Sequence, residues 1–368
     1  MTYYSPGSRE DEILSKKLKH IGKTSDKNAY KENSGKRLFK PRGRIKKTLF
    51  ILAIIFLLIG GALFYKTSSL MSRISISGGS IFGGLFKGTE DVKGMENGRI
   101  NILLIGMRGH NIPGGSLLAD TIMVISVKAE ENEVAMISVP RDLYVAMPGK
   151  NYSRKINEAN VIGEENGKGE GLELMKGVVG NVTGLPIHYA ISANFDALRD
   201  TVDVLGGITV HLDKPFYEGE QFVEGGECGG EFSLAAGDIK LNGETALCYT
   251  RARFATSDFD RARRQQDVLL SMKSKALSVG TLSDFGKLNN LMNVMGDNIR
   301  TDMKSWEMQK LFEILRGVEN PEVYHKVFDT SKEGLLYSTS NGSYILLPVG
   351  DNYNEIHQVC ADIFEEEK

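Results

Sequence analysis

One long apolar run and a series of shorter apolar segments divide this chain into parts of different character. Residues 48–65 (TLFILAIIFLLIGGALFY) contain no charged side chain. About 18 such residues cross a ~30 Å hydrocarbon core, because an α-helix rises about 1.5 Å per residue. Lys and Arg cluster in residues 36–47, directly before this run, and such clusters stay in the cytoplasm. The pattern predicts a single-pass membrane anchor, with the N-terminus cytoplasmic and the main domain extracytoplasmic.

The segments that flank the apolar run are polar. Residues 1–47 are rich in Lys, Ser and Asn, which is typical of a disordered cytoplasmic tail that contacts anionic lipid or serves only as a topology signal. A cleaved signal peptide is the alternative interpretation of the run. The basic region is long for a signal peptide, however, and no Ala-x-Ala step follows. Residues 66–98 are rich in Ser and Gly, so we expect a linker.

From residue 99 onward, short apolar runs alternate with segments of helical periodicity, as in an α/β domain. The short runs suit strands buried on both faces of a sheet, and they are residues 102–105, 121–127, 134–139, 187–192 and 208–212. The helical segments are expected to cover those faces, and they are residues 171–179, 195–205, 261–277 and 306–316. Residues 344–348 and 353–364 add a strand and a closing helix. We expect a main domain at 99–302 and a C-terminal extension, 303–368, packed on it.

Composition and charge narrow the class of protein. The chain has 368 residues, 41% hydrophobic and 25% charged, and a net charge of −2. It is long enough for one large or two ordinary domains. Residues 1–47 contain 14 Lys and Arg against 5 Asp and Glu, so the remainder is acidic. An acidic body argues against a nucleic-acid partner.

The three cysteines, Cys228, Cys248 and Cys360, are widely spaced. No CxxC or Cys/His spacing points to zinc or to a redox pair. Buried free thiols are common in proteins, so the three either remain unpaired or form one disulfide.

A cluster of arginines provides the first candidate chemistry. Tyr249–Arg253 is interpreted as a strand, on which Arg251 and Arg253 share a face because side chains alternate. Two cations would then lie side by side.

A helix is expected directly after this pair. Ser257 and Asp260 have the spacing of a capping box, so the helix should begin near Asp258. Arg261 and Gln265, four residues apart, then lie on one face of its first turns.

Guanidinium groups that converge on a helix N-terminus favour an anion, and their planar donors suit phosphate. The alternative is a solvated helix start at which Asp258, Asp260 and Asp267 neutralise the arginines. The two strand arginines favour the anion site.

Two further segments contribute candidate residues at strand ends. Pro140 after the strand 134–139 fixes a turn that presents Arg141 at the edge of the sheet, with Asp142 to orient it. Asp120 lies at a strand edge beside a Gly-rich loop, a position that suits a magnesium ligand. This loop is neither a Walker loop nor a GxGxxG fingerprint. Lys155 adds one more cation.

The motifs NILLIG, ADTIMV, SVPRDLYV, KINEAN, ALCYTRAR and DFDRARRQQ, in this order, resemble the LytR-CpsA-Psr family over about residues 99–302. The resemblance implies an α/β/α sandwich with a central mixed sheet as the catalytic domain. It also implies a metal-assisted phosphotransferase that moves a glycan phosphate from a polyprenyl-pyrophosphate carrier to a cell-wall acceptor. The apolar helices would enclose the lipid. The positions that match the family's pyrophosphate-binding residues are Arg141, Arg251, Arg253, Arg261 and Gln265, to which we add Lys155.

The resemblance also assigns catalytic roles and exposes two departures. Asp120 matches a ligand of Mg²⁺ (or Mn²⁺), and Asp120 and Arg141 are the expected catalytic residues. Met107 stands where the family usually has a metal-binding Asp, and Leu118-Ala119 replaces an Arg-Ser pair. Arg108 and His110 in the adjacent loop are candidates to compensate.

These departures keep two other functions open. The first is a non-catalytic binder of lipid-linked glycans that acts as a scaffold or regulator. The second is a pyrophosphatase that acts on the lipid carrier with water as the acceptor.

Overall fold

The computed structural model describes residues 91–109, 117–220, 227–254, 256–278, 284–339 and 344–365, and all of them belong to one compact unit. The expected tail, the anchor at 48–65 and most of the linker lie outside these residues. In the described part of the chain, none of the helices combines the length and the apolar character needed to cross a bilayer.

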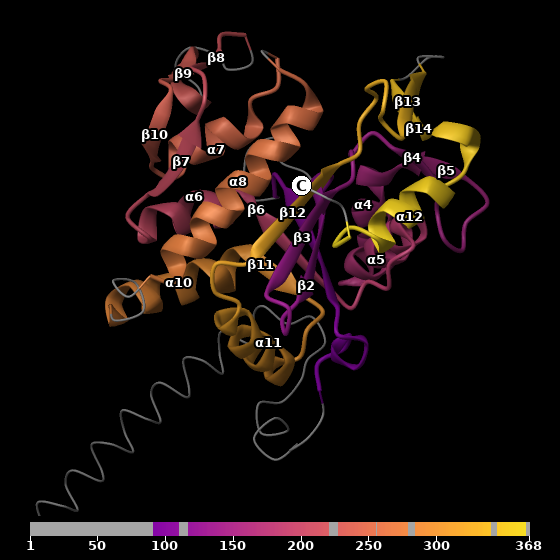
Figure 1. Ribbon diagram of the computed structural model, residues 1–368, viewed down its shortest axis with the longest axis horizontal. Coiled ribbons are helices and arrows are strands. Elements are labelled where there is room, and N and C mark those ends of the chain that lie inside the picture. The colour runs from indigo at the N-terminus through magenta and orange to yellow at the C-terminus, as the bar shows by residue number, and fades with distance from the viewer. Residues whose placement is uncertain are drawn as a thin grey trace, which may run out of the picture. The chain divides into compact units, whose positions relative to one another are not determined.

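A six-stranded mixed sheet forms the centre of this unit (Figure 1). Its strands, in spatial order, are β11 (Ile299–Thr301), β6 (Tyr189–Asn194), β1 (Ile100–Met107), β2 (Ala119–Lys128), β3 (Glu133–Ser138) and β12 (Glu322–Val327). β1 pairs in parallel with β6, and β3 pairs in parallel with β12, whereas β2 and β11 run antiparallel to their neighbours. The mixed α/β fold is therefore confirmed.

Helices cover both faces of this sheet. Leu103, Ile105 and their neighbours on β2 and β3 pack against α5 (Glu170–Thr183) and α12 (Asn354–Ala361), beside α4 (Ala159–Asn166). On the opposite face, Met123 and Met136 pack against α8 (Asp258–Ala276) and α11 (Ser305–Gly317). Successive side chains of a strand point to opposite faces. Because both faces of the sheet are covered, most positions of its central strands are apolar. Each fully buried Leu or Ile stabilises the fold by about 1.5–3 kcal/mol.

A second group of elements extends from the face covered by α8. α6 (Phe195–Val204) packs against α7 (Gly243–Arg251) and α10 (Phe285–Asn298). Two small antiparallel pairs complete this group, namely β7 (Ile208–Leu212) with β10 (Gly237–Leu241), and β8 (Phe216–Glu218) with β9 (Phe232–Leu234). The prediction that 208–212 is buried on both faces was wrong. β7 pairs with β10 outside the central sheet, and its residues alternate between buried and exposed.

The C-terminal part of the chain contributes to the same unit. β12, which the sequence analysis missed, is an edge strand of the central sheet. A hairpin of β13 (Leu336–Thr339) and β14 (Ile345–Pro348) lies next to β4 (Tyr144–Ala146), which pairs with β5 (Ser153–Lys155). The strand and helix expected at 344–348 and 353–364 are thus present as β14 and α12.

Of the two arrangements left open for the cysteines, the structure has one disulfide. Cys228 and Cys248 are bonded, with Cα atoms 5.7 Å apart, and Cys360 is a buried free thiol. The bond links the turn at Glu227–Gly229 to α7.

Candidate functional site

The strand directions bring the candidate residues to one edge of the central sheet. β1 and β3 are parallel and end there, whereas the antiparallel β2 begins there. Met107 therefore pairs with Ala119, next to Asp120. Arg141 is the third residue after the end of β3 at Ser138 and follows Val139-Pro140 directly. At Gly106, a Cβ atom would lie 2.8 Å from Cβ of Thr121, so the close approach of β1 and β2 requires glycine. Asp120 and Arg141, expected at strand ends, therefore lie at the same edge of the sheet.

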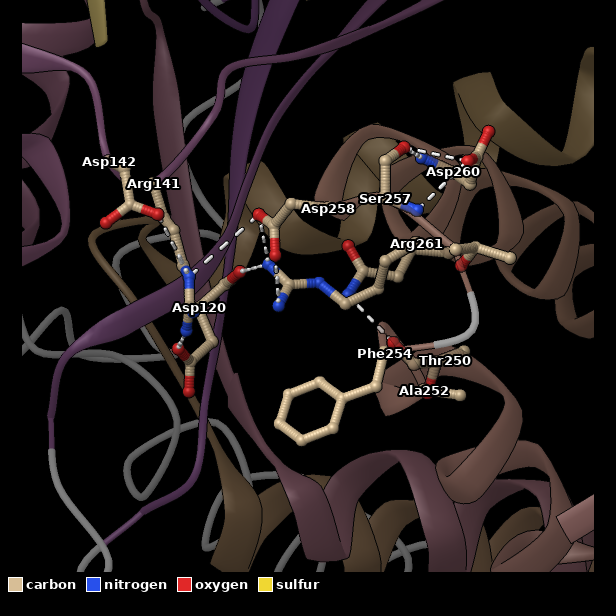
Figure 2. Close-up of polar contacts among 12 residues, drawn as sticks. Asp120, Arg141, Asp142, Thr250, Ala252, Phe254, Ser257, Asp258, Asp260 and Arg261 are labelled. Carbon is tan, nitrogen blue, oxygen red and sulfur yellow. Dashed lines mark hydrogen bonds and ion pairs between the residues drawn. The ribbon is translucent and has the colours of Figure 1, made fainter. Parts of the chain in front are cut away.

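Arg141 lies among three carboxylates. Its Nη1 donates to Oδ1 of Asp120, and its Nε lies 3.8 Å from Oδ2 of Asp142 and 3.9 Å from Oδ2 of Asp258 (Figure 2). The Nε atom is buried and makes no hydrogen bond. A buried donor without a partner is costly, so an acceptor oxygen from a ligand would stabilise this arrangement.

Arg261 approaches the same point from α8. The capping box of Ser257 and Asp260 is present and begins the helix at Asp258, as predicted. The Arg261 guanidinium forms two 2.9 Å contacts with Asp258 and donates to the backbone carbonyl of Asp120 at 3.0 Å (Figure 2). Its side chain is only 8% exposed, and its Nε also makes no hydrogen bond.

The surroundings of the two guanidinium groups shift their pKa values in opposite directions. Burial lowers the pKa of Arg261, the neighbouring charges of Arg141 and Arg253 lower it further, and Asp258 and Asp120 oppose them. Burial also lowers the pKa of Arg141, but Asp258, Asp120 and Asp142 together raise it above its ordinary value. Arginine stays protonated in proteins, so Arg261 remains a buried cation, paired with Asp258. A bound anion would add a favourable charge interaction with both guanidinium groups.

The strand predicted at Tyr249–Arg253 was wrong, because Tyr249–Arg251 form the end of helix α7 and the next two residues begin a loop. Asn242 and Thr245 form a capping box that starts the helix, and the hydroxyl of Thr250 bonds to the carbonyl of Ala246 one turn earlier. A short buried apolar run does not distinguish a strand from a buried helix. Here the capping box of Asn242 and Thr245 favours the helix.

Arg251 and Arg253 nevertheless line one cavity. Arg251 ends α7, and its guanidinium lies over the ring of Phe195 at 4.7 Å. Arg253 follows in the loop and lies over the ring of Phe254 at 5.5 Å. Gln265 donates to the carbonyl of Thr250 at 3.2 Å, which joins α7 to α8.

The cavity combines a charged end with a long apolar part. Its volume is about 1560 Å³. At the sheet edge it is lined by the polar residues Arg108, Asp120, Arg141, Arg251, Arg253, Arg261 and Gln265. Away from this edge it runs between the sheet and α6, α8, α10 and α11, where its lining includes Leu198, Leu269, Met272, Met292, Met295, Trp306, Met308 and Phe312. Such a cavity suits a ligand with an anionic head and an apolar tail.

Lys155 reaches this cluster through a carboxylate. Its Nζ lies 2.6 Å from Oδ1 of Asp142, directly beside Arg141. His110, the loop residue expected to compensate for Met107, lies outside the described residues.

Arg264 is a residue whose role the sequence analysis missed. It is 6% exposed, donates from Nε to the carbonyl of Tyr249 at 2.9 Å, and also donates to the carbonyl of Ala252. Its guanidinium stacks on the ring of Phe216 at 4.8 Å. It therefore holds the end of α7 and the loop that carry Arg251 and Arg253. The RARR run gave no signal to separate this buried arginine from its exposed neighbour.

The described residues provide one carboxylate at the expected metal position. Asp120 has a second oxygen, which points away from Arg141 in Figure 2, whereas Met107 offers only a thioether, a poor ligand for Mg²⁺. Within the described residues, the one group of three metal-binding side chains close together is Cys228, Glu244 and Cys248, and its two cysteines are disulfide-bonded. Mg²⁺ commonly binds one or two carboxylates and completes its shell with phosphate oxygens and water. Asp120 fits that minimal requirement.

Known proteins share this sequence pattern and fold. The model of the LytR_cpsA_psr family matches residues 85–360. The polyisoprenyl-teichoic acid–peptidoglycan teichoic acid transferase TagU of Bacillus cereus is 30% identical over 301 residues, covering 77% of this chain and 90% of that protein. The crystal structure of B. subtilis TagU has a TM-score of 0.50 at 25% identity and covers 73% of this chain and 98% of its own. TagT bound to LIIa-WTA has a TM-score of 0.56 at 23% identity, covers 79% and 97%, and shares the fold.

Proposed function

Because this chain belongs to the LytR-CpsA-Psr family, we propose that it is a glycopolymer transferase that moves a glycan phosphate from a polyprenyl-pyrophosphate carrier to a cell-wall acceptor. The observation that supports this most strongly is the single cavity with arginines at one end and apolar side chains along the rest. The diphosphate binds the arginines, and the polyprenyl chain occupies the apolar part. The B. cereus relative is named as a teichoic acid transferase that acts on peptidoglycan, which supports a peptidoglycan-like acceptor.

The proposed reaction is an in-line displacement at phosphorus. The oxygen of an acceptor hydroxyl attacks the phosphorus that bears the glycan, and the bond from this phosphorus to the bridging oxygen breaks. Polyprenyl phosphate leaves, the glycan phosphate becomes a diester with the acceptor, and the hydroxyl proton passes to solvent or to the leaving phosphate. Arg141 and Arg261 stabilise the charge that develops on the phosphate oxygens, because their guanidiniums are fixed beforehand by Asp120 and Asp258.

We further propose that Asp120 binds Mg²⁺ or Mn²⁺ together with the substrate diphosphate. The ion would neutralise phosphate charge next to Arg141. Substitution of Asp120 by Asn should then reduce turnover more than affinity, and a chelator should slow the wild-type protein strongly.

The test is incubation of the full-length chain with a polyprenyl-diphosphate-linked glycan, with and without peptidoglycan fragments. The proposal predicts polyprenyl phosphate and glycan-modified peptidoglycan. Release of polyprenyl phosphate together with free glycan phosphate, unaffected by acceptor, would instead identify a pyrophosphatase. Tight binding without turnover under any metal would identify a non-catalytic binder. Met107 favours that function, because it stands where the family usually has a metal-binding Asp.

We also propose that the protein is anchored in the cell membrane by residues 48–65, with residues 1–47 in the cytoplasm. The excess of Lys and Arg before the apolar run supports this orientation. A reporter that works only in the cytoplasm should be active when fused near residue 40 and inactive when fused after Lys368. The reverse pattern would contradict both the orientation and the cell-wall function.

A further inference from the structure

The segment that carries Arg141 is in direct contact with the C-terminal hairpin. The backbone N–H of Leu346 on β14 donates to the carbonyl of Asp142 at 3.0 Å, and Leu143 and Leu346 form a parallel bridge. Strand β14 therefore contributes to the surroundings of the charged cluster, although its sequence shows no motif for that chemistry.

Tyr344 lies at the start of this contact. It is two residues before Leu346, which corresponds to about 7 Å of extended chain, and its side chain is 50% exposed. The charges of Asp142 and Asp258 act on its hydroxyl: burial raises the pKa of Tyr344, and these two carboxylates raise it further. They are two of the carboxylates that surround Arg141. The backbone contacts of Leu346 place the start of β14 beside the segment that carries Arg141 and Asp142, and Tyr344 is not part of the cavity lining.

The expected orientation of the bound lipid-linked glycan gives Tyr344 a candidate role. If the diphosphate binds Arg141 and Arg261 while the lipid fills the apolar part, the glycan on the outer phosphate must extend outward past the sheet edge. Pyranose rings present C–H faces that pack on aromatic rings, and a tyrosine also offers a hydroxyl for hydrogen bonding. A single exposed tyrosine is ordinary on a protein surface. What distinguishes Tyr344 is that it lies two residues from Leu346, whose backbone bonds to Asp142 beside Arg141.

We infer that Tyr344 forms a saccharide subsite, where its ring stacks on the sugar attached to the carrier diphosphate. This inference rests on the proposed function and adds a contact to the glycan, which the arginines do not supply. It also gives the C-terminal hairpin a part in substrate recognition.

The test compares two ligands on the full-length chain in detergent. One is a short-chain polyprenyl diphosphate, and the other is the same diphosphate carrying a hexose disaccharide. Tyr344→Ala should weaken binding of the disaccharide ligand about three- to tenfold, as expected for one aromatic contact, and leave binding of the sugar-free ligand unchanged. Tyr344→Phe keeps the ring and should retain most of the affinity.

Tyr337→Ala is the matched control. Tyr337 is on the same hairpin, is 39% exposed, and donates its hydroxyl to Asp351 at 2.7 Å. The Tyr337→Ala variant should bind both ligands like the wild-type protein. Equal weakening of both ligands by Tyr344→Ala, or no weakening of either, would overturn the subsite. Failure of the wild-type protein to bind even the sugar-free diphosphate would overturn the proposed function, and the subsite with it.

Discussion

Arg141 and Asp120, 21 residues apart in the chain, form an ion pair at the edge of the central sheet. The pair exists because β2 begins where β3 ends, which brings the start of one strand beside the turn after the other. It fixes both the guanidinium and the carboxylate before any ligand binds. Such preorganisation is what electrostatic catalysis at a phosphate requires.

Arg261 provides the sharpest test by substitution. Arg261→Lys keeps the charge but loses the planar pair of donors that contacts Asp258 and the Asp120 carbonyl. Lys would also lose a hydrogen bond that the guanidinium donates to the diphosphate. Loss of one such charged hydrogen bond costs about 1.5–3 kcal/mol, so affinity for a polyprenyl diphosphate should fall about tenfold to a hundredfold. The same change at Arg251 and Arg253 should weaken binding as well, measured by titration with thermal melting as the check on folding.

Arg263 offers a matched control for this substitution. It also pairs with an aspartate three residues earlier, Asp260, at 2.8 Å, but its side chain is 52% exposed and it does not line the cavity. Arg263→Lys should bind the diphosphate like the wild-type protein, because exposed ion pairs contribute little. Equal tolerance of Lys at 261 and 263 would mean that the cluster is a solvated helix start.

The disulfide can be tested by counting thiols. Burial raises the pKa of Cys360 to about 12, so a thiol reagent at pH 8 should label nothing in the native protein. After unfolding, one thiol should react without reductant and three should react with it. Reduction should also lower the free energy of unfolding by about 2–4 kcal/mol. A Cys228→Ser/Cys248→Ser variant should be indifferent to reductant. Three reactive thiols in the unreduced, unfolded protein would contradict the bond.

The sequence predicted the central elements well where periodicity was strong. The runs that became β1, β2 and β3 are apolar at most positions, without strict alternation with polar residues, because both faces of the sheet are covered. The cap at Ser257 located the start of α8. Periodicity did not identify α7, since a buried run such as ALCYT carries no polar face, and it did not reveal that β12 pairs with β3.

The candidate site was predictable in its residue types but less so in its geometry. Arg251 and Arg253 were assigned to one strand, yet they line the same cavity from a helix end and from the loop after it. What positions them is Arg264, whose contacts to Tyr249 and Ala252 depend on tertiary packing. No local pattern in the RARR run could indicate which arginine would be buried.

The contribution of Asp260, at the start of α8, to folding stability depends on pH. Burial acts to raise the pKa of Asp260, but its bonds to Ser257 and the charge of Arg263 outweigh burial and lower it below 3.8. The ionised form is therefore the one stabilised in the folded state, so its contribution is present above about pH 4 and is lost as the pH falls through the folded pKa.

Two substitutions at this helix start test that account. Asp260→Asn should destabilise the protein at pH 7, and the difference from the wild-type protein should shrink as the pH drops below 3.8. Ser257→Ala, which removes the cap itself, should cost about 1 kcal/mol. The measurement is the free energy of unfolding from denaturant titrations at several pH values. A difference for Asp260→Asn that stays constant with pH would contradict the role of the carboxylate.

A structure of the protein with a polyprenyl diphosphate bound would show directly whether the arginine-lined cavity is the substrate site. We predict that the diphosphate contacts Arg141, Arg251, Arg253 and Arg261, and that the polyprenyl chain fills the apolar cavity between the sheet, α8, α10 and α11. A diphosphate bound elsewhere on the protein, or a lipid chain that lies outside this cavity, would contradict the account.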